Sequence, residues 1–455
     1  MDVIMTNRAD VVCGLGFGDE GKGVVAARLV NEAVQDAGAE RTAVVRFSGG
    51  PQNAHNVCWA EQVGGKAVHH TFAQIGSGGR YCTSVDTFTA QYVPVDPISL
   101  FCEADAFMGN EHQDSAIAEV CLRQFFHEES LLILPLHEQI SKFRELRLKR
   151  GSTGRGIFEV NKFAEIHPEL SPRLRDLSEP GILTEKVYAF WKWANDGMPD
   201  ENSAKIIAEG TFREVDAAGE VQDFMSFCEN TMGNSYRTFL QNIYSGKDWL
   251  RRVNTKQRLI FEGGQGILLD SRFGFFPNVT FSHTTAHNAA DILNRLDPIQ
   301  ELRNHGVIRT YATRHGAGPF PYEIDKGQPD YTAFLLAEEH NKPSFAGTMR
   351  FAPLSADLLN YAMEIFRLDG AELTDIHITH CDTTQFALVS QMDCGVSGYE
   401  TADLAYILRD EDEKRRNVIN EWGRKLALNK KAAESADPGR FFNICKVHCH
   451  DSPYI

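Results

Sequence analysis

Short β-branched runs that end in glycine-rich or polar turns are the sequence feature that most constrains the fold. A run of this kind, bounded by such turns, is typical of a buried strand that leads into a functional loop. Four runs follow the pattern, at residues 10–13 before GLGFGDEG, 42–47 before SGG, 258–261 before EGGQG and 306–311 before ATRHGAG. The chain is therefore predicted to contain a sheet of buried strands.

Amphipathic helical periodicity fills the spaces between these runs. It is clearest in residues 24–37, 115–126, 355–366 and 403–428. The alternation of strands and helices indicates an α/β fold, with a P-loop-like, mostly parallel central sheet flanked by helices. In such sheets ligands bind beyond the carboxyl ends of the strands, which is where the turns lie.

The chain of 455 residues shows no linker, internal repeat or low-complexity tract that would mark a domain boundary. We therefore expect one elaborated domain over residues 1–455. Residues from about 95 to 150 and from about 160 to 250 are rich in helix formers, so they are predicted to be mainly helical insertions. The charged run at 409–416 is interpreted as the solvated face of a helix.

The charge balance excludes several classes of partner. The chain carries 46 Lys and Arg against 62 Asp and Glu, a formal net charge of −16. An acidic surface repels nucleic-acid phosphates and anionic lipids, so neither a nucleic acid nor a membrane is expected as a partner. An anionic substrate must therefore bind in a locally basic or amide-lined pocket.

Several features favour a cytoplasmic location. The first residues, MDVIMTNRAD, contain no signal-like apolar core, and no uncharged apolar run approaches the roughly 18 residues that span a bilayer. Ten cysteines are scattered without C-x-x-C pairs, as expected in a reducing compartment. Cys445, His448, Cys449 and His450 offer ligand types that suit zinc, but their spacing matches no familiar structural site, so their role stays open.

The strongest local signal is the segment GFGDEGKG, which begins at Gly16 and fits the pattern G-x-x-x-x-G-K. Its glycines let backbone amides surround phosphate oxygens, the following helix adds its dipole, and Lys22 supplies a positive charge. A standard P-loop has Ser or Thr after the lysine to hold Mg²⁺, whereas this chain has Gly23. Asp19, inside the loop, is the candidate metal ligand instead.

The same loop also reads as G-x-G-x-x-G, the pattern of a dinucleotide site. Such a site needs an acidic residue at the end of the second strand to hold a ribose hydroxyl. The strand at 42–47 carries Arg46 and continues into SGG. The sequence therefore disfavours a nicotinamide or flavin site.

Two further loops carry polar groups suited to phosphate. His55 follows a glycine turn with several amides, and can either donate to a phosphate or serve as a structural hydrogen-bonding residue. The segment GSTGRG at 151–156 combines hydroxyls, flexible backbone and an arginine, which suits a monophosphate, although an ordinary turn would look similar.

Taken together, these loops resemble those of the adenylosuccinate synthetases, which join aspartate to inosine monophosphate (IMP) at the expense of GTP. The resemblance rests on five segments in family order, together with a weaker match at Thr379-His-Cys-Asp382. The five are GFGDEGKG from Gly16, SGGPQNAHN from Ser48, GSTGRGI from Gly151, FEGGQGILLD from Phe261 with GFFPNVTFSHTT from Gly274, and TRHGAGPFPYE from Thr313.

The resemblance implies the catalytic groups. Asp19 would be the base that takes the N1 proton of IMP while GTP phosphorylates O6, and it would also contact Mg²⁺. His55 would be the catalytic acid at the transferring phosphoryl group. Gln265 would hydrogen-bond the purine carbonyl, and the carbonyl of Ala54 would face the metal.

It also implies the binding groups and a homodimer. GTP would be held by Gly18, Glu20, Gly21, Lys22, Gly23 and, at its guanine, Asp382. The acceptor nucleotide and aspartate would be held by Gln52, Asn53, Thr153, Gln265, Thr280 and Arg350.

The chain departs from the family at several of these positions. Pro-Gln-Asn-Ala at 51–54 replaces the usual His-Asn-Ala-Gly, so the longer Gln52 stands where an amide meets the nucleotide phosphate. Of the family's arginine-rich aspartate loop, Arg350 alone is retained, and the guanine segment carries His380 in place of lysine.

Three functions remain open from the sequence. The first is the synthesis of adenylosuccinate from IMP, L-aspartate and GTP. The second is the same ligation on GMP or dGMP, as in phage relatives that replace the loop aspartate by serine, which Asp19 disfavours. The third is a non-enzymatic GTP-binding regulatory protein, which the retention of Asp19, Lys22, His55 and Gln265 argues against.

Overall fold

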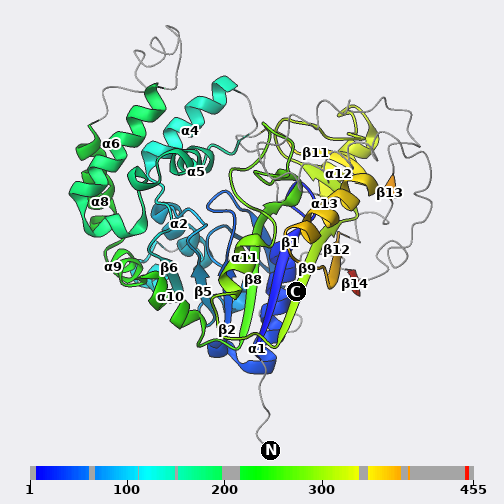
Figure 1. The fold of residues 1–455 in the computed structure, drawn as a ribbon, viewed down its shortest axis with the longest axis horizontal. Helices are drawn as coiled ribbons and strands as arrows, with labels where there is room; N and C mark the ends of the chain where they lie inside the picture. The colour runs from blue at the N-terminus through cyan, green and yellow to red at the C-terminus, as the bar shows by residue number, and fades with distance from the viewer. Residues whose placement is uncertain are drawn as a thin grey trace, which may run out of the picture.

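A parallel β-sheet forms the centre of the computed structural model, which confirms the predicted α/β class (Figure 1). The structure describes residues 7–60, 67–110, 112–148, 152–196, 216–337, 347–380, 388–389 and 446–449. The sheet has nine strands, and every pair of neighbours is parallel. In order across the sheet they are β14 (Lys446–Cys449), β12 (Asp375–Thr379), β9 (Glu301–Arg309), β1 (Arg8–Gly14), β8 (Arg258–Gly266), β2 (Thr42–Arg46), β5 (Asp86–Thr89), β6 (Gln124–His127) and β7 (Ile243–Tyr244).

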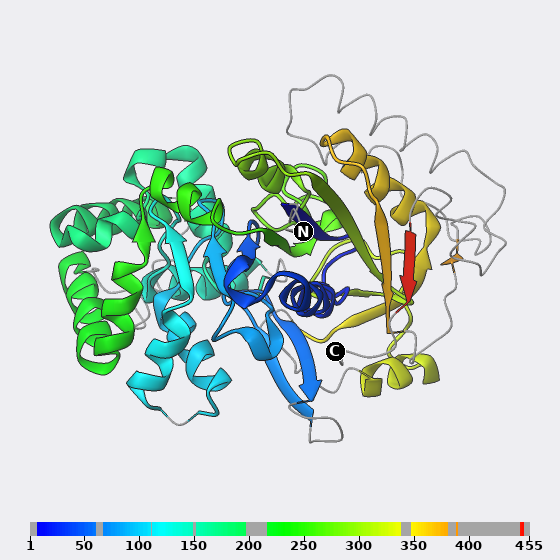
Figure 2. The same ribbon diagram turned by 90° about the horizontal axis from the view of Figure 1, so that it is seen from below.

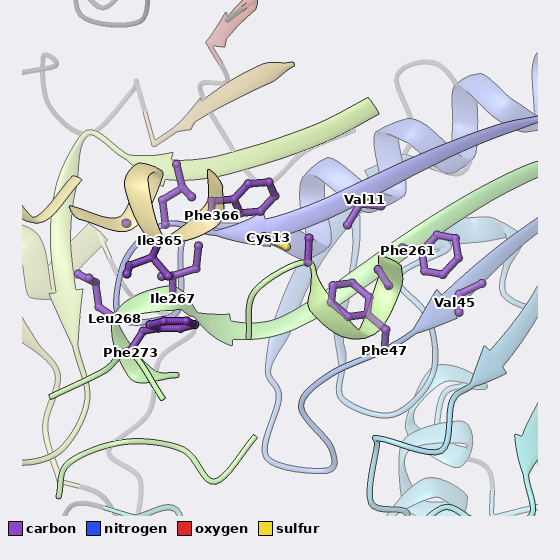
Figure 3. Packing of buried hydrophobic residues seen from close by; sticks show 14 of the residues in the cluster. Val11, Cys13, Val45, Phe47, Phe261, Ile267, Leu268, Phe273, Ile365 and Phe366 are labelled. Carbon is purple, nitrogen blue, oxygen red and sulfur yellow. The ribbon is translucent and has the colours of Figure 1, made fainter. Parts of the chain in front are cut away.

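The central strands are apolar because both faces of the sheet are covered. On one face Val12 packs with Val25 and Leu29 of α1 (Lys22–Ala37). Figure 2 shows α1 lying alongside the sheet. On the other face, Val11 and Cys13 belong to one apolar core with Ile365 and Phe366 of α13 (Ala356–Leu368), part of which Figure 3 shows, and α11 (His287–Leu293) contributes to the same core.

Most of the other helices gather beyond the β5–β7 side of the sheet (Figure 1). Their bounds are α2 (Pro97–Phe107), α3 (Asp114–Cys121), α4 (Pro135–Leu148), α5 (Ile157–Ile166), α6 (Pro180–Asp196), α8 (Ala217–Thr231), α9 (Gly233–Gln241), α10 (Gly246–Val253) and, near β11, α12 (Pro329–Ala337). The stretches 95–150 and 160–250 thus supply most of these helices, though not α12, and they also supply β6 and β7, which extend the central sheet.

The helix expected at 115–126 is shorter than predicted. It ends at Cys121, because Phe125 and Phe126 lie in β6, which pairs with β5 on one side and β7 on the other. Aromatic residues favour strands, all four residues of β6 are buried, and four residues are too few to show a strand period. The region predicted as helix at 403–428 and the charged run at 409–416 lie outside the described residues.

Two small sheets border the central one. Strands β10 (Tyr311–Arg314), β11 (Arg350–Ser355) and β13 (Leu388–Val389) form one, and β3 (His55–Ala60) pairs with β4 (Ala67–Phe72) in the other. None of the helices in the described ranges has the length and apolar character needed to cross a membrane.

Candidate active site

The predicted site loops leave the sheet at one edge. Strands β1, β2, β8, β9 and β12 are neighbours or near neighbours and run parallel, so their carboxyl ends lie together. Contacts between the loops confirm that they meet: Gly264 N donates to Ser48 Oγ at 2.9 Å, and Thr379 Oγ1 donates to the Glu20 carbonyl at 2.7 Å. Segments far apart in sequence therefore build one site.

The glycine-rich loop between β1 and α1 is organised from inside by Glu20. Its carboxylate accepts hydrogen bonds from the backbone N–H groups of Gly16 (3.0 Å) and Gly18 (2.7 Å), and it pairs with Lys22 Nζ at 2.6 Å. Both charged side chains are buried. Glu20 therefore acts on the shape of the loop and on the position of Lys22, which is the loop's cation.

Gly23 explains why this loop does not end in Ser or Thr. A Cβ atom at this position would lie 2.5 Å from His55 Cβ and 3.1 Å from Ser77 Oγ. Real Cβ atoms do not approach that closely, so the first turn of α1 can pack on the start of β3 only without a side chain here. The absence of a side chain at Gly23 thus makes room for His55.

His55 is held by a buried carboxylate. Its Nδ1 lies 2.5 Å from Glu262 Oε1, and Glu262 also accepts from the N–H (2.9 Å) and Oγ (2.5 Å) of Ser77. Burial opposes ionisation of Glu262, but Arg46 and His55 outweigh it and lower the pKa of the carboxyl to about 2. Burial lowers the pKa of His55, and the Glu262 carboxylate opposes that effect. The contact fixes the ring and leaves Nε2 available.

Asp19 is surrounded by cationic side chains. His315 Nε2 lies 3.1 Å from Asp19 Oδ2, and both side chains are partly exposed, at 29% and 24%. Burial would raise the pKa of Asp19, but His315, Arg309 and Lys22 hold it below its usual range. Asp19 is therefore an ionised carboxylate at the mouth of the loop.

A cluster of amides lies next to these charges. Gln265 Nε2 donates to Asn53 Oδ1 at 2.7 Å, which joins the end of β8 to the loop after β2. Within the described structure, Gln265 Oε1, Asn53 Nδ2 and both polar atoms of Gln52 are buried without a hydrogen-bond partner. Buried polar groups are normally paired, so these atoms indicate a binding surface for a polar ligand.

Comparisons with known proteins agree with this arrangement. A sequence model of the adenylosuccinate synthetase family matches residues 11–387. The adenylosuccinate synthetase of Ralstonia nicotianae is 31% identical over 385 residues, which cover 82% of this chain and 77% of that protein. That of Desulfovibrio desulfuricans is 28% identical over 407 residues, 88% of this chain and 84% of its own.

The chain belongs to the adenylosuccinate synthetase family. Its fold is that of the fully ligated adenylosuccinate synthetase from Plasmodium falciparum, with a TM-score of 0.65 at 18% identity, covering 98% of this chain and 97% of that one. Family members are GTP-dependent ligases that use IMP and aspartate. The protein is accordingly a GTP-dependent ligase of purine biosynthesis.

The two threonines predicted to hold the IMP phosphate lie on segments that meet. Thr153 is exposed just before α5, and Thr280 lies in the loop after β8, where its N–H donates to Leu269 O at 2.8 Å. The rings of Phe158 and Phe281 join the two segments, with centroids 4.9 Å apart. The contact shows that the two segments meet, and the binding of phosphate by the two hydroxyls stays a prediction.

Arg350, predicted to hold aspartate, is engaged with the chain itself. It pairs with the carboxylate of Glu323 through Nε at 2.8 Å, and its Nη1 donates to the carbonyls of Gly316 (3.0 Å) and Gly318 (2.9 Å). Asp382 lies outside the described residues, whereas His380 is described. Burial and the nearby Arg309 lower the pKa of His380 to about 2, so its ring is neutral at physiological pH.

Sequence reasoning gave no role to Glu262, Ser77, Arg309 or His315. Glu262 and His315 do lie in quoted segments, EGGQG and TRHGAG. Their partners are His55 and Asp19, each more than 200 positions away in the chain. Only the fold brings such pairs together.

Proposed function

We propose that the protein joins L-aspartate to IMP, with GTP as co-substrate and a 6-phosphoryl-IMP intermediate. A purine 6-oxo group is a poor leaving group, so it must be phosphorylated before an amine can displace it. The observation that carries the proposal is the convergence of Asp19, His55 and Gln265 at one sheet edge beside Lys22.

Asp19 takes the N1 proton of IMP in the first step. Loss of that proton places negative charge on O6, which then attacks the γ-phosphorus of GTP. The ionised state of Asp19 and its partial exposure suit a base that faces the substrate.

His55 and Lys22 act on the phosphoryl group. The ionised Glu262 carboxylate accepts from Nδ1–H of His55 and favours the imidazolium form of the ring, and in that form Nε2–H can donate to a phosphate oxygen as charge spreads in the transition state. Lys22, steadied by Glu20, supplies the positive charge beside the GTP phosphates, together with the backbone of Gly18, Gly21 and Gly23.

The amide cluster binds the acceptor nucleotide. The remaining N–H of Gln265 Nε2 donates to the purine carbonyl, and the orientation of this amide is set by Asn53. Gln52, with both polar atoms free of partners in the described structure, is available to the nucleotide. Thr153 and Thr280 hold the phosphate of IMP from the two segments that meet at Phe158 and Phe281.

The residues present fit a magnesium ion. Asp19 keeps one carboxylate oxygen clear of the His315 contact, and the backbone of Ala54 lies at an exposed position next to His55. Oxygen donors of this kind are the ligands that Mg²⁺ prefers. When bound, the ion would offset the negative charge of the phosphates.

The second step is displacement of phosphate from C6 by the amine of aspartate. Arg350 holds one carboxylate of aspartate, and Thr348, Thr284, Thr285 and backbone amides serve the other. For Arg350 this requires that its ion pair with Glu323 be replaced by one with the substrate.

Three further parts belong to the proposal. Asp382 hydrogen-bonds the guanine of GTP. The protein acts as a homodimer, and it works in the cytoplasm.

Release of inorganic phosphate, followed with mass spectrometry of the nucleotide product, tests the proposal. Phosphate release and a succinyl adduct should require IMP, aspartate and GTP together, and omission of any one should abolish both. An adduct formed on GMP or dGMP instead would favour the second function, and GTP binding without turnover would favour the third.

A further inference from the structure

The imidazole of His315 lies beside the proposed base and has no part in the mechanism above. Its Nε2 faces Asp19 Oδ2 at 3.1 Å, while its Nδ1 is buried with no hydrogen-bond partner in the described structure. The ring therefore makes one polar contact, and that contact is with Asp19.

Two guanidinium groups fix the backbone that carries His315. Arg314 donates to the carbonyls of Pro319 (2.6 Å) and Asn278 (3.1 Å). Arg350 donates to the carbonyls of Gly316 and Gly318, at 3.0 and 2.9 Å. The loop is thus anchored on both sides of the ring, so the scaffold sets the position of His315.

Asp19 itself sits on a strained part of the backbone. Its φ is 64° and the preceding Gly18 has a φ of 98°, a region that non-glycine residues adopt at a cost. No other hydrogen bond reaches the Asp19 carboxylate among the residues the structure describes. The direction of that carboxylate therefore depends on His315.

We propose that His315 is a positioning residue for Asp19: the hydrogen bond from Nε2–H to Oδ2 turns the second carboxylate oxygen toward the N1 proton of the purine. The inference rests on the proposed role of Asp19 as the base. It requires the imidazole only as a hydrogen-bond donor.

The effect belongs to the chemical step and not to substrate binding. A base that is free to rotate still leaves the nucleotide and GTP sites intact, but fewer bound complexes have an oxygen in line with the proton. Misplacement of a reacting group by about 1 Å can cost on the order of 100-fold in rate. Loss of the contact should therefore lower kcat and leave KM unchanged.

Steady-state kinetics of His315→Phe and His315→Gln in the phosphate-release assay test this inference. Phe keeps the volume of the ring and removes the donor, so kcat should fall roughly 10- to 100-fold with KM for IMP and GTP unchanged. Gln places an amide N–H near the position of Nε2, so it should restore most of the rate. His315→Asn, whose amide is too short to reach Oδ2, provides a second loss variant should the Phe variant fail to fold.

His112→Phe is the matched control. His112 also pairs with an aspartate, Asp105, at 2.6 Å, but its side chain is 80% exposed and lies outside the site. Its replacement should leave kcat at the unmodified value, and melting temperatures should confirm that all variants fold.

Asp19→Asn, measured in the same assay, separates the inference from the proposed function. No adduct from the unmodified protein would overturn the function itself, and turnover by Asp19→Asn would overturn the role of Asp19 as the base, on which the inference rests. An inactive Asp19→Asn with a normal rate for His315→Phe would overturn only the positioning role. Equal losses in the Phe and Gln variants would overturn it too, because a donor would then not be what matters.

Discussion

Three residues at the site have a left-handed backbone conformation although they are not glycine. Asp19, Gln265 and His380 have φ values of 64°, 50° and 58°. Such conformations cost on the order of 1–3 kcal/mol each and persist where surrounding contacts hold them. The contacts are present: His315 on Asp19, Asn53 on Gln265 and Thr310 on the His380 carbonyl.

Asp19→Asn should fold and bind GTP but lose turnover. Asn keeps the size of the side chain and removes the proposed base together with the negative charge proposed to face the metal, and loss of a catalytic base costs about 10²–10⁴-fold. Single-turnover phosphate release checks the rate, and equilibrium titration with GTP checks binding. Near-normal turnover would show that another group takes the N1 proton.

Gly23→Ala should damage the site through His55. The added Cβ would lie 2.5 Å from His55 Cβ, so either the histidine moves or α1 shifts, at a cost of about 1–3 kcal/mol in unfolding free energy. The turnover rate should fall together with the unfolding free energy. Gly181→Ala in α6 is the control, because a Cβ there meets nothing within 4 Å. Urea unfolding and kcat should therefore show a loss for Gly23→Ala and little change for Gly181→Ala. Equal values for the two variants would contradict the packing argument.

At the scale of strands, a polar row crosses the sheet away from the site. His305 on β9 contacts Asp10 on β1 (2.9 Å) and His377 on β12 (2.9 Å). His377 stacks on His448 of β14, with centroids 4.6 Å apart, and His448 Nε2 lies 2.8 Å from Asp375 Oδ1. The row links four neighbouring strands, including the outermost one.

The carboxylates of this row should make the free energy of unfolding depend on pH in the acidic range. Burial opposes ionisation of Asp10, but His305 and Arg8 outweigh it and lower its pKa. A lowered folded-state pKa contributes stability above the unfolded value, about 3.9, and that contribution is lost as pH falls through the folded value. Asp10→Asn should therefore be less stable than the unmodified chain at pH 7, and the gap should narrow below about pH 4.

Urea unfolding of both proteins at several pH values measures this gap. Asp325→Asn, at an exposed position, is the control and should change stability little at any pH. A gap that stays constant into acid would mean that Asp10 acts by packing alone.

The central elements were predictable because each carries a local signal. The runs before GLGFGDEG, SGG and EGGQG became β1, β2 and β8, and the helix at 24–37 became α1. Strands β6 and β7 were not predicted, because four and two residues hold too little of a pattern. The His55–Glu262 and Asp19–His315 contacts depend on packing between distant segments, which no local pattern encodes.

On the scale of the whole molecule, a net charge of −16 surrounds a site for anionic substrates. Among the described residues, the cations beside the loops at the carboxyl ends of the strands include Lys22, Arg46 and Arg309, all of which are buried. Each is already close to a carboxylate, which is Glu20, Glu262 and Asp19 respectively. Binding of nucleotides must therefore rely on these cations together with the amide cluster and the backbone of the glycine-rich loop.

The last prediction concerns which substrates this site accepts. We expect IMP as the acceptor, because the 2-amino group of a guanine nucleotide needs extra room beside the base. The phage relatives gain that room with a serine, and this chain keeps Asp19. Competition between IMP, GMP and dGMP in the presence of aspartate and GTP, read by mass spectrometry, should give the succinyl adduct on IMP. An adduct mainly on a guanine nucleotide would contradict this assignment.

Aspartate should bind more weakly than in arginine-rich relatives, because the proposed site offers its two carboxylates a single retained arginine, Arg350, which already pairs with Glu323. Each charged hydrogen bond lost removes roughly 1.5–3 kcal/mol, or about 10- to 100-fold in affinity. Glu323→Gln weakens the competing ion pair while keeping an amide near Arg350, so it should lower KM for aspartate and leave KM for GTP unchanged. Arg350→Lys should raise KM for aspartate, because lysine cannot make the bidentate contact. If both variants leave that KM unchanged, the donor carboxylates are held by other groups.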